Sequence, residues 1–144
     1  MSDSGANNSM PVYQYTVKFR IISGEPSFEL QQNGVKVPNT IQIDEPMAAL
    51  VFNLDAAFFD GATGSFGTNV QWLSDDTCMP IERPNNFAYT RENDTTFVVF
   101  DVNTTTGSSD TVFHFLYSVV KSTTSDAVMY TSPDPVIINK KPPA

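Results

Sequence analysis

Few residues of this chain have side chains suited to catalysis. It has one histidine, His114, and one cysteine, Cys78. A Ser-His-Asp triad would place a carboxylate on one side of the His114 ring and a hydroxyl on the other. Ser65 comes nearest to a nucleophile elbow, but Thr63 stands where the G-x-S-x-G pattern requires glycine. We expect structural roles for His114 and Cys78, and no catalytic residue.

Metal and phosphate sites also lack their usual sequence patterns. Asp75, Asp76 and Glu82 form the one local group of acids, without the D-x-D-x-D-G spacing of a calcium loop. A zinc site would need ligands from one histidine, one cysteine and scattered carboxylates. The glycine-rich residues 60–68 lack the G-K-S/T of a phosphate-binding loop and are predicted to form a flexible loop. We therefore predict neither a metal nor a cofactor.

Four residues are candidates for stacking on a small ligand or for contact at the surface: Trp72, Phe87, Tyr89 and Arg91. They lie in or beside residues 60–68 and 75–93, the two stretches predicted to be loops. The alternative interpretation is that the rings fill the core, as aromatic residues at alternating positions usually do. For the single tryptophan the core interpretation is favoured, because tryptophan often anchors the interior of a β-sandwich.

The charge balance restricts the partners of the protein. The 144 residues include 8 Lys and Arg against 16 Asp and Glu, which gives a net charge of −8. This charge repels nucleic acids and anionic membranes. Hydrophobic residues make up 40% of the chain, which is enough to bury a core. The first residues contain no apolar stretch of the length that a signal peptide or membrane span needs, so we expect a soluble cytoplasmic protein.

The elements that would position these residues are β-strands, because apolar and polar side chains alternate along much of the chain. Residues 111–121 and Val12–Ile22 each commit one face to a core. Asn33-Gly34 predicts a type I′ hairpin. Residues 75–93 are predicted to be the longest irregular connection, and residues 135–139 a strand at an edge or with a bulge, because nearby prolines remove ladder donors. The expected core faces are Tyr13, Tyr15, Val17, Phe19 and Ile21; Val98, Phe100 and Val102; and Phe113, Phe115, Tyr117 and Val119.

Residues 47–59 fit two patterns. Apolar residues from Met47 to Phe58 fall on one helical stripe, with Pro46 suited to a first turn and Gly61 to a helix end. The same segment also alternates as a strand does. A strand is favoured, because the rest of the chain indicates a sandwich that needs an inner strand here. The helix remains the alternative.

These patterns together predict an all-β fold with one domain. Residues 1–10 are expected to be a disordered tail, and residues 11–144 a single domain. That domain is predicted to be a mainly antiparallel β-sandwich of about seven to nine strands, with an immunoglobulin-like or related Greek-key arrangement.

The second half of the chain carries a resemblance. Gln71-Trp72-Leu73, ERPNNF, TTFVVFDVN, TVFHFLYSVV and SPDPVIINKKPP resemble segments of the small bacterial proteins grouped as the DP-EP family. Asp134-Pro135 is the most telling match, whereas Lys141-Pro142 stands where a Glu-Pro would close the motif. The chain is more distantly similar to the inclusion-body proteins of the AidA and PixA kind. Both resemblances imply a β-sandwich with an unassigned role, and neither supplies a catalytic residue.

The leading functional hypothesis is a non-catalytic binding or structural module that acts through a surface, as a homo-oligomer or with a protein partner. The alternative is a small-ligand or carbohydrate-binding domain that uses the loops of residues 60–68 and 75–93. A hydrolase ranks third, since no signature marks a nucleophile.

Overall fold

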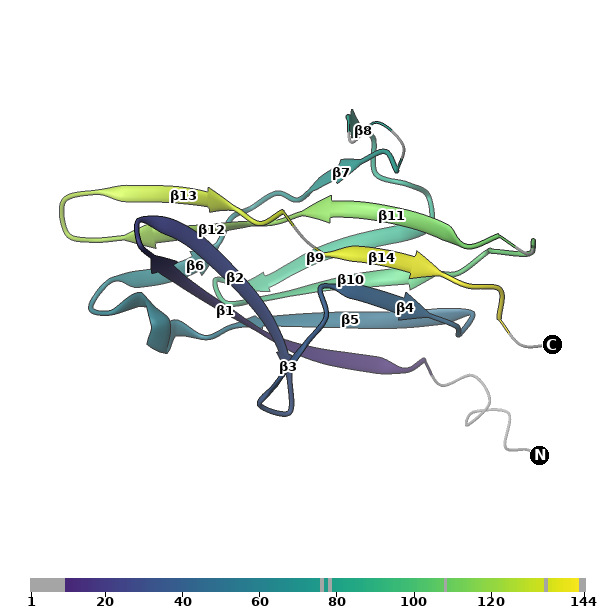
Figure 1. The fold of residues 1–144 in the computed structure, drawn as a ribbon, viewed down its shortest axis with the longest axis horizontal. Helices are drawn as coiled ribbons and strands as arrows, with labels where there is room; N and C mark the ends of the chain where they lie inside the picture. Colours follow the sequence, from purple (N-terminus) through teal and green to yellow (C-terminus); the bar gives the residue numbers. More distant parts are fainter. Residues whose placement is uncertain (1–9, 76, 78, 108, 134, 143–144) are drawn as a thin grey trace.

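The computed structural model describes residues 10–142 except 76, 78, 108 and 134, and the predicted N-terminal tail falls almost wholly outside this range. The described residues form fourteen strands and one 3-10 helix (Figure 1). The fold is all-β, as predicted. The elements are β1 (Val12–Ile22), β2 (Glu25–Gln32), β3 (Val35–Val37), β4 (Thr40–Ile43), β5 (Met47–Leu54), η1 (Ala56–Phe59), β6 (Thr63–Phe66), β7 (Gln71–Leu73), β8 (Pro80–Ile81), β9 (Phe87–Asn93), β10 (Thr96–Val102), β11 (Thr111–Leu116), β12 (Ser118–Ser122), β13 (Ala127–Thr131) and β14 (Val136–Asn139).

The strands form three sheets that make two layers. One layer is the six-stranded sheet β3-β2-β1-β5-β10-β9. The other consists of β4-β14-β11-β7-β8 and β13-β12-β6, which lie end to end because β11 leads into β12 after a single residue (Figure 1). Pairing is antiparallel except between β1 and β5 and between β4 and β14. The predicted, mainly antiparallel β-sandwich is therefore confirmed, although seven to nine strands was too few.

Aromatic rings join the two layers. Phe52 of β5 stacks on Phe97 at 4.7 Å between ring centroids and meets Phe115 of the opposite layer edge-on at 6.1 Å. At one end of the sandwich, Phe19 of β1 contacts Tyr130 of β13 at 5.0 Å. Each buried ring removes about 150–250 Å² from water, so these contacts dominate the stabilisation of the core.

The segment of residues 111–121 is two strands instead of the predicted one. Phe115, Tyr117 and Val119 are buried as expected, and Phe113 packs partly buried against them. The break falls at Tyr117, where the chain leaves its pairing with β7 and β14 and begins to pair with β6 and β13. Pairing with two successive sets of neighbours explains why one apolar pattern yields two strands.

The predicted core face of β10 is wrong. Phe97 and Val99 are fully buried, and Asp101 faces inward beside them with 1% exposure, while Val102 is 42% exposed. Val98 is buried as well, so the strand is apolar on both faces. The alternation of apolar residues favoured the face of Val98, Phe100 and Val102. The true inner face of β10 was missed because it includes the buried carboxyl group of Asp101.

Residues 60–68 are not the predicted flexible loop, because they contain β6. Gly64 is buried in this strand, and a Cβ atom built on it would lie 2.3 Å from the ring of Phe59. The glycine is therefore required by close packing and not by a loop. Residues 75–93 likewise contain β8 and β9 where an irregular connection was predicted.

The structure confirms two further predictions, a strand at residues 47–54 and a turn at Asn33-Gly34. Residues 47–54 form a strand, as favoured over a helix, and the short helix η1 follows it. Asn33 and Gly34 have φ values of 52° and 78°, as the predicted type I′ turn requires.

The terminal strand β14 is not at an edge, because β4 and β11 flank it. Its prolines lie outside Val136–Asn139 and so remove no donor from the ladder.

Candidate functional site

The first candidate site is a pocket of about 350 Å³ at the β8 edge of the five-stranded sheet, near β7. Trp72 and Tyr89 line it, so the structure brings together two of the four predicted contact residues. Arg83 supplies a positive charge at the pocket, although its guanidinium already donates a hydrogen bond to the carbonyl oxygen of Phe87. The other lining residues are Thr68, Asn69, Val70, Gln71, Pro80 and Ile81.

The predicted contact residues do not act as one stacking platform. Trp72 is 4% exposed and stacks on Phe87, which is 1% exposed, at 4.7 Å between ring centroids. The core interpretation of Trp72 is confirmed, and Phe87 has no ring face open to a ligand. Arg91 does not line the pocket; its guanidinium donates to the carbonyl oxygen of Phe66 at 3.1 Å and pairs with Asp94 at 2.9 Å. Arg91 therefore has a structural role in fixing β9 against β6.

His114 has half of the arrangement that a hydrolase would need. Its Nε2 atom lies 3.0 Å from Oδ1 of Asp75, in the loop that follows β7. Among the described residues, neither a hydroxyl nor a second carboxylate contacts the ring, and no group of three metal-ligating side chains occurs. Cys78 and Asp76 lie outside the described residues.

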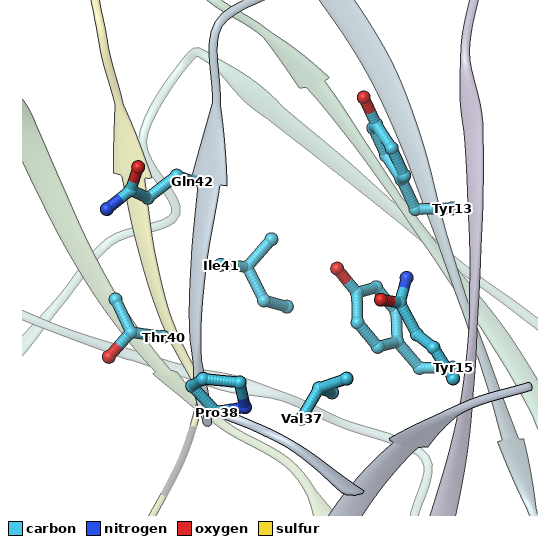
Figure 2. Close-up of a pocket in the computed structure, with 8 residues that line it drawn as sticks. Tyr13, Tyr15, Val37, Pro38, Thr40, Ile41 and Gln42 are labelled. Atoms are coloured by element: carbon cyan, nitrogen blue, oxygen red, sulfur yellow. The ribbon is translucent and has the colours of Figure 1, made fainter. Parts of the chain in front are cut away.

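The second candidate site was not found from the sequence. It is a pocket of about 280 Å³ between β1 and the outer edge of β4 (Figure 2). Tyr13 and Tyr15 project from β1 on one side, and Ile41 of β4 faces them (Figure 2). The two tyrosines alternate as core residues do, so their spacing did not distinguish them from the core. The lining is completed by Gln32, Val37, Pro38, Thr40 and Gln42.

Both phenols of this pocket stay neutral around pH 7. The hydroxyl of Tyr13 donates a hydrogen bond to the carboxylate of Glu45, and this bond, together with burial, raises the pKa of Tyr13 to about 12. Burial alone raises the pKa of Tyr15 to about 12. The Tyr15 hydroxyl has no hydrogen-bond partner within the described part of the chain. It is therefore an unused donor at the pocket.

A buried polar cluster lies elsewhere in the core, where β10, β14 and β4 meet. Asn139 donates to Asp101 at 2.8 Å. The side-chain amide of Asn103 donates to the carbonyl oxygens of Ile43 at 3.1 Å and of Lys140 at 2.7 Å. These bonds fasten the parallel strands β4 and β14 to the end of β10. The cluster lines neither pocket, so we assign it a structural role.

Comparison with known proteins identifies a family that matches most of the chain. The model of the DP-EP family matches residues 11–141, which supports the resemblance seen in the sequence. No curated protein matches the chain. No helix of the described residues is long and apolar enough to cross a bilayer.

Proposed function

Since the chain belongs to the DP-EP family, whose description names no activity, we propose its function from its own geometry. The protein is a non-catalytic module that assembles by pairing the free edge of β13 with the same edge of a second copy. The observation that carries this proposal is an uncharged strand edge with exposed apolar side chains.

The edge of β13 is open because β4 stops short of it. Strands β13 and β14 follow one another along the same layer, and β4 pairs with β14 from Val136 onward. Before Thr40 the chain turns away toward β3, so β4 does not extend alongside β13. In the described part of the chain, β13 pairs only with β12. An unpaired edge of this kind offers a row of backbone donors and acceptors to another strand.

The other sheet edges carry features that discourage such pairing, whereas β13 does not. Its sequence, AVMYT, contains neither charge nor proline, and Met129 and Val128 are 64% and 41% exposed. Charges, prolines and short lengths are the usual means of protecting an edge. The protected edges are β3 with Lys36, β9 with Arg91 and Glu92, the four-residue strands β4 and β6, and β8, which has two residues and begins with Pro80.

An antiparallel pair of β13 strands would satisfy a two-fold axis, because each copy presents the same edge to the other. The two β13-β12-β6 sheets would then become one continuous sheet of six strands. A five-residue edge buries little area, and both copies carry a charge of −8, so we expect weak association that strengthens with salt.

The test is sedimentation velocity over a hundredfold range of protein concentration. We expect the average mass to rise from monomer toward dimer, and Met129→Lys to abolish the rise, because it places a charge at the paired edge. Met79→Lys is the matched control, since Met79 is 61% exposed but lies next to β8. A monomer at every concentration, or equal loss of association in both variants, would contradict the proposal.

A second candidate function, small-ligand binding, is supported by the pocket at Trp72 and Tyr89. Its volume of about 350 Å³ lies within the range of small-molecule sites. Trp72 is the only tryptophan, so its fluorescence reports on this pocket alone. A saturable change on titration with a ligand, lost in Tyr89→Ala, would support this function. Unchanged fluorescence across a ligand panel would count against it.

A further inference from the structure

We infer that the pocket between β1 and β4 is a binding site for a small, neutral, polyhydroxylated molecule of the monosaccharide class. This site is distinct from the free edge of β13 and from the Trp72 pocket. It does not depend on self-association.

The hydroxyl group of Tyr15 supports this ligand class. The residue is only 7% exposed, and its ring stacks on Phe52 at 5.3 Å between centroids, which fixes the ring in the core. Its hydroxyl points toward Ile41 across the pocket (Figure 2). Although the residue as a whole is buried, its hydroxyl reaches the open space of the pocket and bonds to none of the described residues, so a ligand oxygen could take the place of water there. A ligand oxygen in the pocket would supply the missing acceptor.

The backbone of β4 has an open edge at this pocket. Asn39 and Ile43 direct their carbonyl oxygens at β14, where they accept from Val136 at 3.0 Å and from Lys140 at 2.9 Å. Main-chain groups alternate in direction along a strand, so those of Thr40 and Gln42 point to the opposite side. Both residues line the pocket. Their N–H and C=O groups therefore offer donors and acceptors to a ligand.

The distribution of polarity and charge also supports this ligand class. Among the residues that the structure describes, no charged side chain lines the pocket, and the net charge of −8 disfavours anions. The hydroxyl of Tyr13 donates to Glu45, so its oxygen is left to accept a hydrogen bond from a ligand. Ile41 and Val37 give the pocket an apolar wall. A sugar ring fits this combination, because its hydroxyl groups both donate and accept while its C–H groups pack on apolar side chains.

The size of the pocket agrees with a ligand of one ring. Its volume of about 280 Å³ is just below the volumes of sites for drug-sized ligands, which are roughly 300–1,000 Å³. An oligosaccharide would have to extend beyond it into solvent.

The experiment is a titration of the full chain with sugars, monitored through the amide chemical shifts in two-dimensional NMR spectra. The chain carries Met129→Lys, which removes self-association. The probes are glucose, galactose, mannose and, as a charged counterpart, glucuronate. We expect saturable shifts from at least one neutral sugar, centred on Tyr13, Tyr15 and residues 40–42. Glucuronate should bind more weakly than glucose.

Tyr15→Phe is the decisive variant, because it removes the hydroxyl and keeps the ring that stacks on Phe52. We expect it to weaken binding roughly tenfold, as the loss of one hydrogen bond does. Tyr89→Phe, in the other pocket, should leave the affinity unchanged. The inference is overturned if no neutral sugar gives saturable shifts here, if the shifts centre on Trp72, or if Tyr15→Phe binds as tightly as the parent protein. Because the binding test is done in the Met129→Lys variant, its result does not depend on whether β13 mediates self-association.

Discussion

Asn139 donates a hydrogen bond from Nδ2 to Oδ1 of Asp101 at 2.8 Å, and neither residue is more than 1% exposed. The other oxygen of each side chain, Oδ2 of Asp101 and Oδ1 of Asn139, is buried and has no partner among the described residues. A proton on Oδ2 of Asp101 would convert that oxygen into a donor. The neutral acid therefore suits this position better than the carboxylate does.

The first prediction concerns the pH dependence of stability. Burial raises the pKa of Asp101 from 3.8 to about 6, against a smaller lowering by the hydrogen bond from Asn139. Because the folded pKa is above the unfolded one, the stabilisation is complete below about pH 4 and is lost as the pH rises to 6. We expect the free energy of unfolding to fall by roughly 2–3 kcal/mol across this interval, measured by urea denaturation.

Asp101→Asn should remove this dependence, because an amide cannot ionise. The variant should be more stable than the parent protein by about 1–3 kcal/mol at pH 8 and similar to it at pH 4. Asp110→Asn is the control, since Asp110 is partly exposed and pairs with Lys140 at 3.6 Å on the surface. It should keep the fall between pH 4 and 6. An unchanged fall in Asp101→Asn would assign the titration to another group.

The second prediction concerns the side-chain amide that ties β4 to β14. Asn103 donates to two carbonyl oxygens and accepts from the backbone N–H of Thr105 at 3.1 Å. Asn103→Ala would leave the carbonyl oxygen of Lys140 and the N–H of Thr105 without these bonds and would remove one of the two bonds that the carbonyl oxygen of Ile43 accepts, so we expect a loss of about 2–4 kcal/mol in the free energy of unfolding. Asn86→Ala removes two similar bonds from a less buried residue, so it should cost about 1 kcal/mol. Equal costs would show that burial does not set the difference.

The third prediction concerns Gly64. A methyl group at this position would overlap the ring of Phe59, so Gly64→Ala should destabilise the protein by about 1–3 kcal/mol. Gly107→Ala is the control, because the nearest atom to its added methyl group is 3.9 Å away, and it should change stability by no more than about 0.5 kcal/mol. Thermal unfolding measures both. In a double-mutant cycle, Phe59→Leu should reduce the cost of Gly64→Ala.

These predictions depend on features that the sequence revealed unequally. The alternation in Val12–Ile22 placed Tyr15, Val17 and Phe19 correctly in the core, because one face of the strand is apolar and the other polar, but Ile21, expected on the same core face, is 40% exposed. Strand β10 lacks that contrast, and its inward Asp101 reversed the prediction. Gly64 was assigned to a loop because glycine is common in turns, whereas its role depends on the ring of Phe59, which only the three-dimensional packing shows.

The sites were harder to predict than the fold. Trp72 and Tyr89 were identified from residue type and do line one pocket. The pocket at Tyr15 depends on the open edge of β4, and therefore on which strand ends beside which. A sequence alone does not give the order of strands in a sheet. The free edge of β13 was not predicted for the same reason, because it also depends on the order of the strands.

The last prediction concerns the ionisation of the tyrosines at alkaline pH. In the folded protein, Tyr13 and Tyr15 should form phenolates only near pH 12, measured by absorbance immediately after a pH jump; in urea, all five tyrosines should ionise near pH 10. Both folded pKa values are raised, so the stabilisation from the neutral phenols is complete below pH 10 and lost toward pH 12. Glu45→Gln should lower the pKa of Tyr13, because the hydrogen bond to Glu45 is the largest cause of its shift. It should leave Tyr15 unchanged, since burial alone shifts that group. A common shift of both tyrosines would instead indicate that the variant opens the pocket.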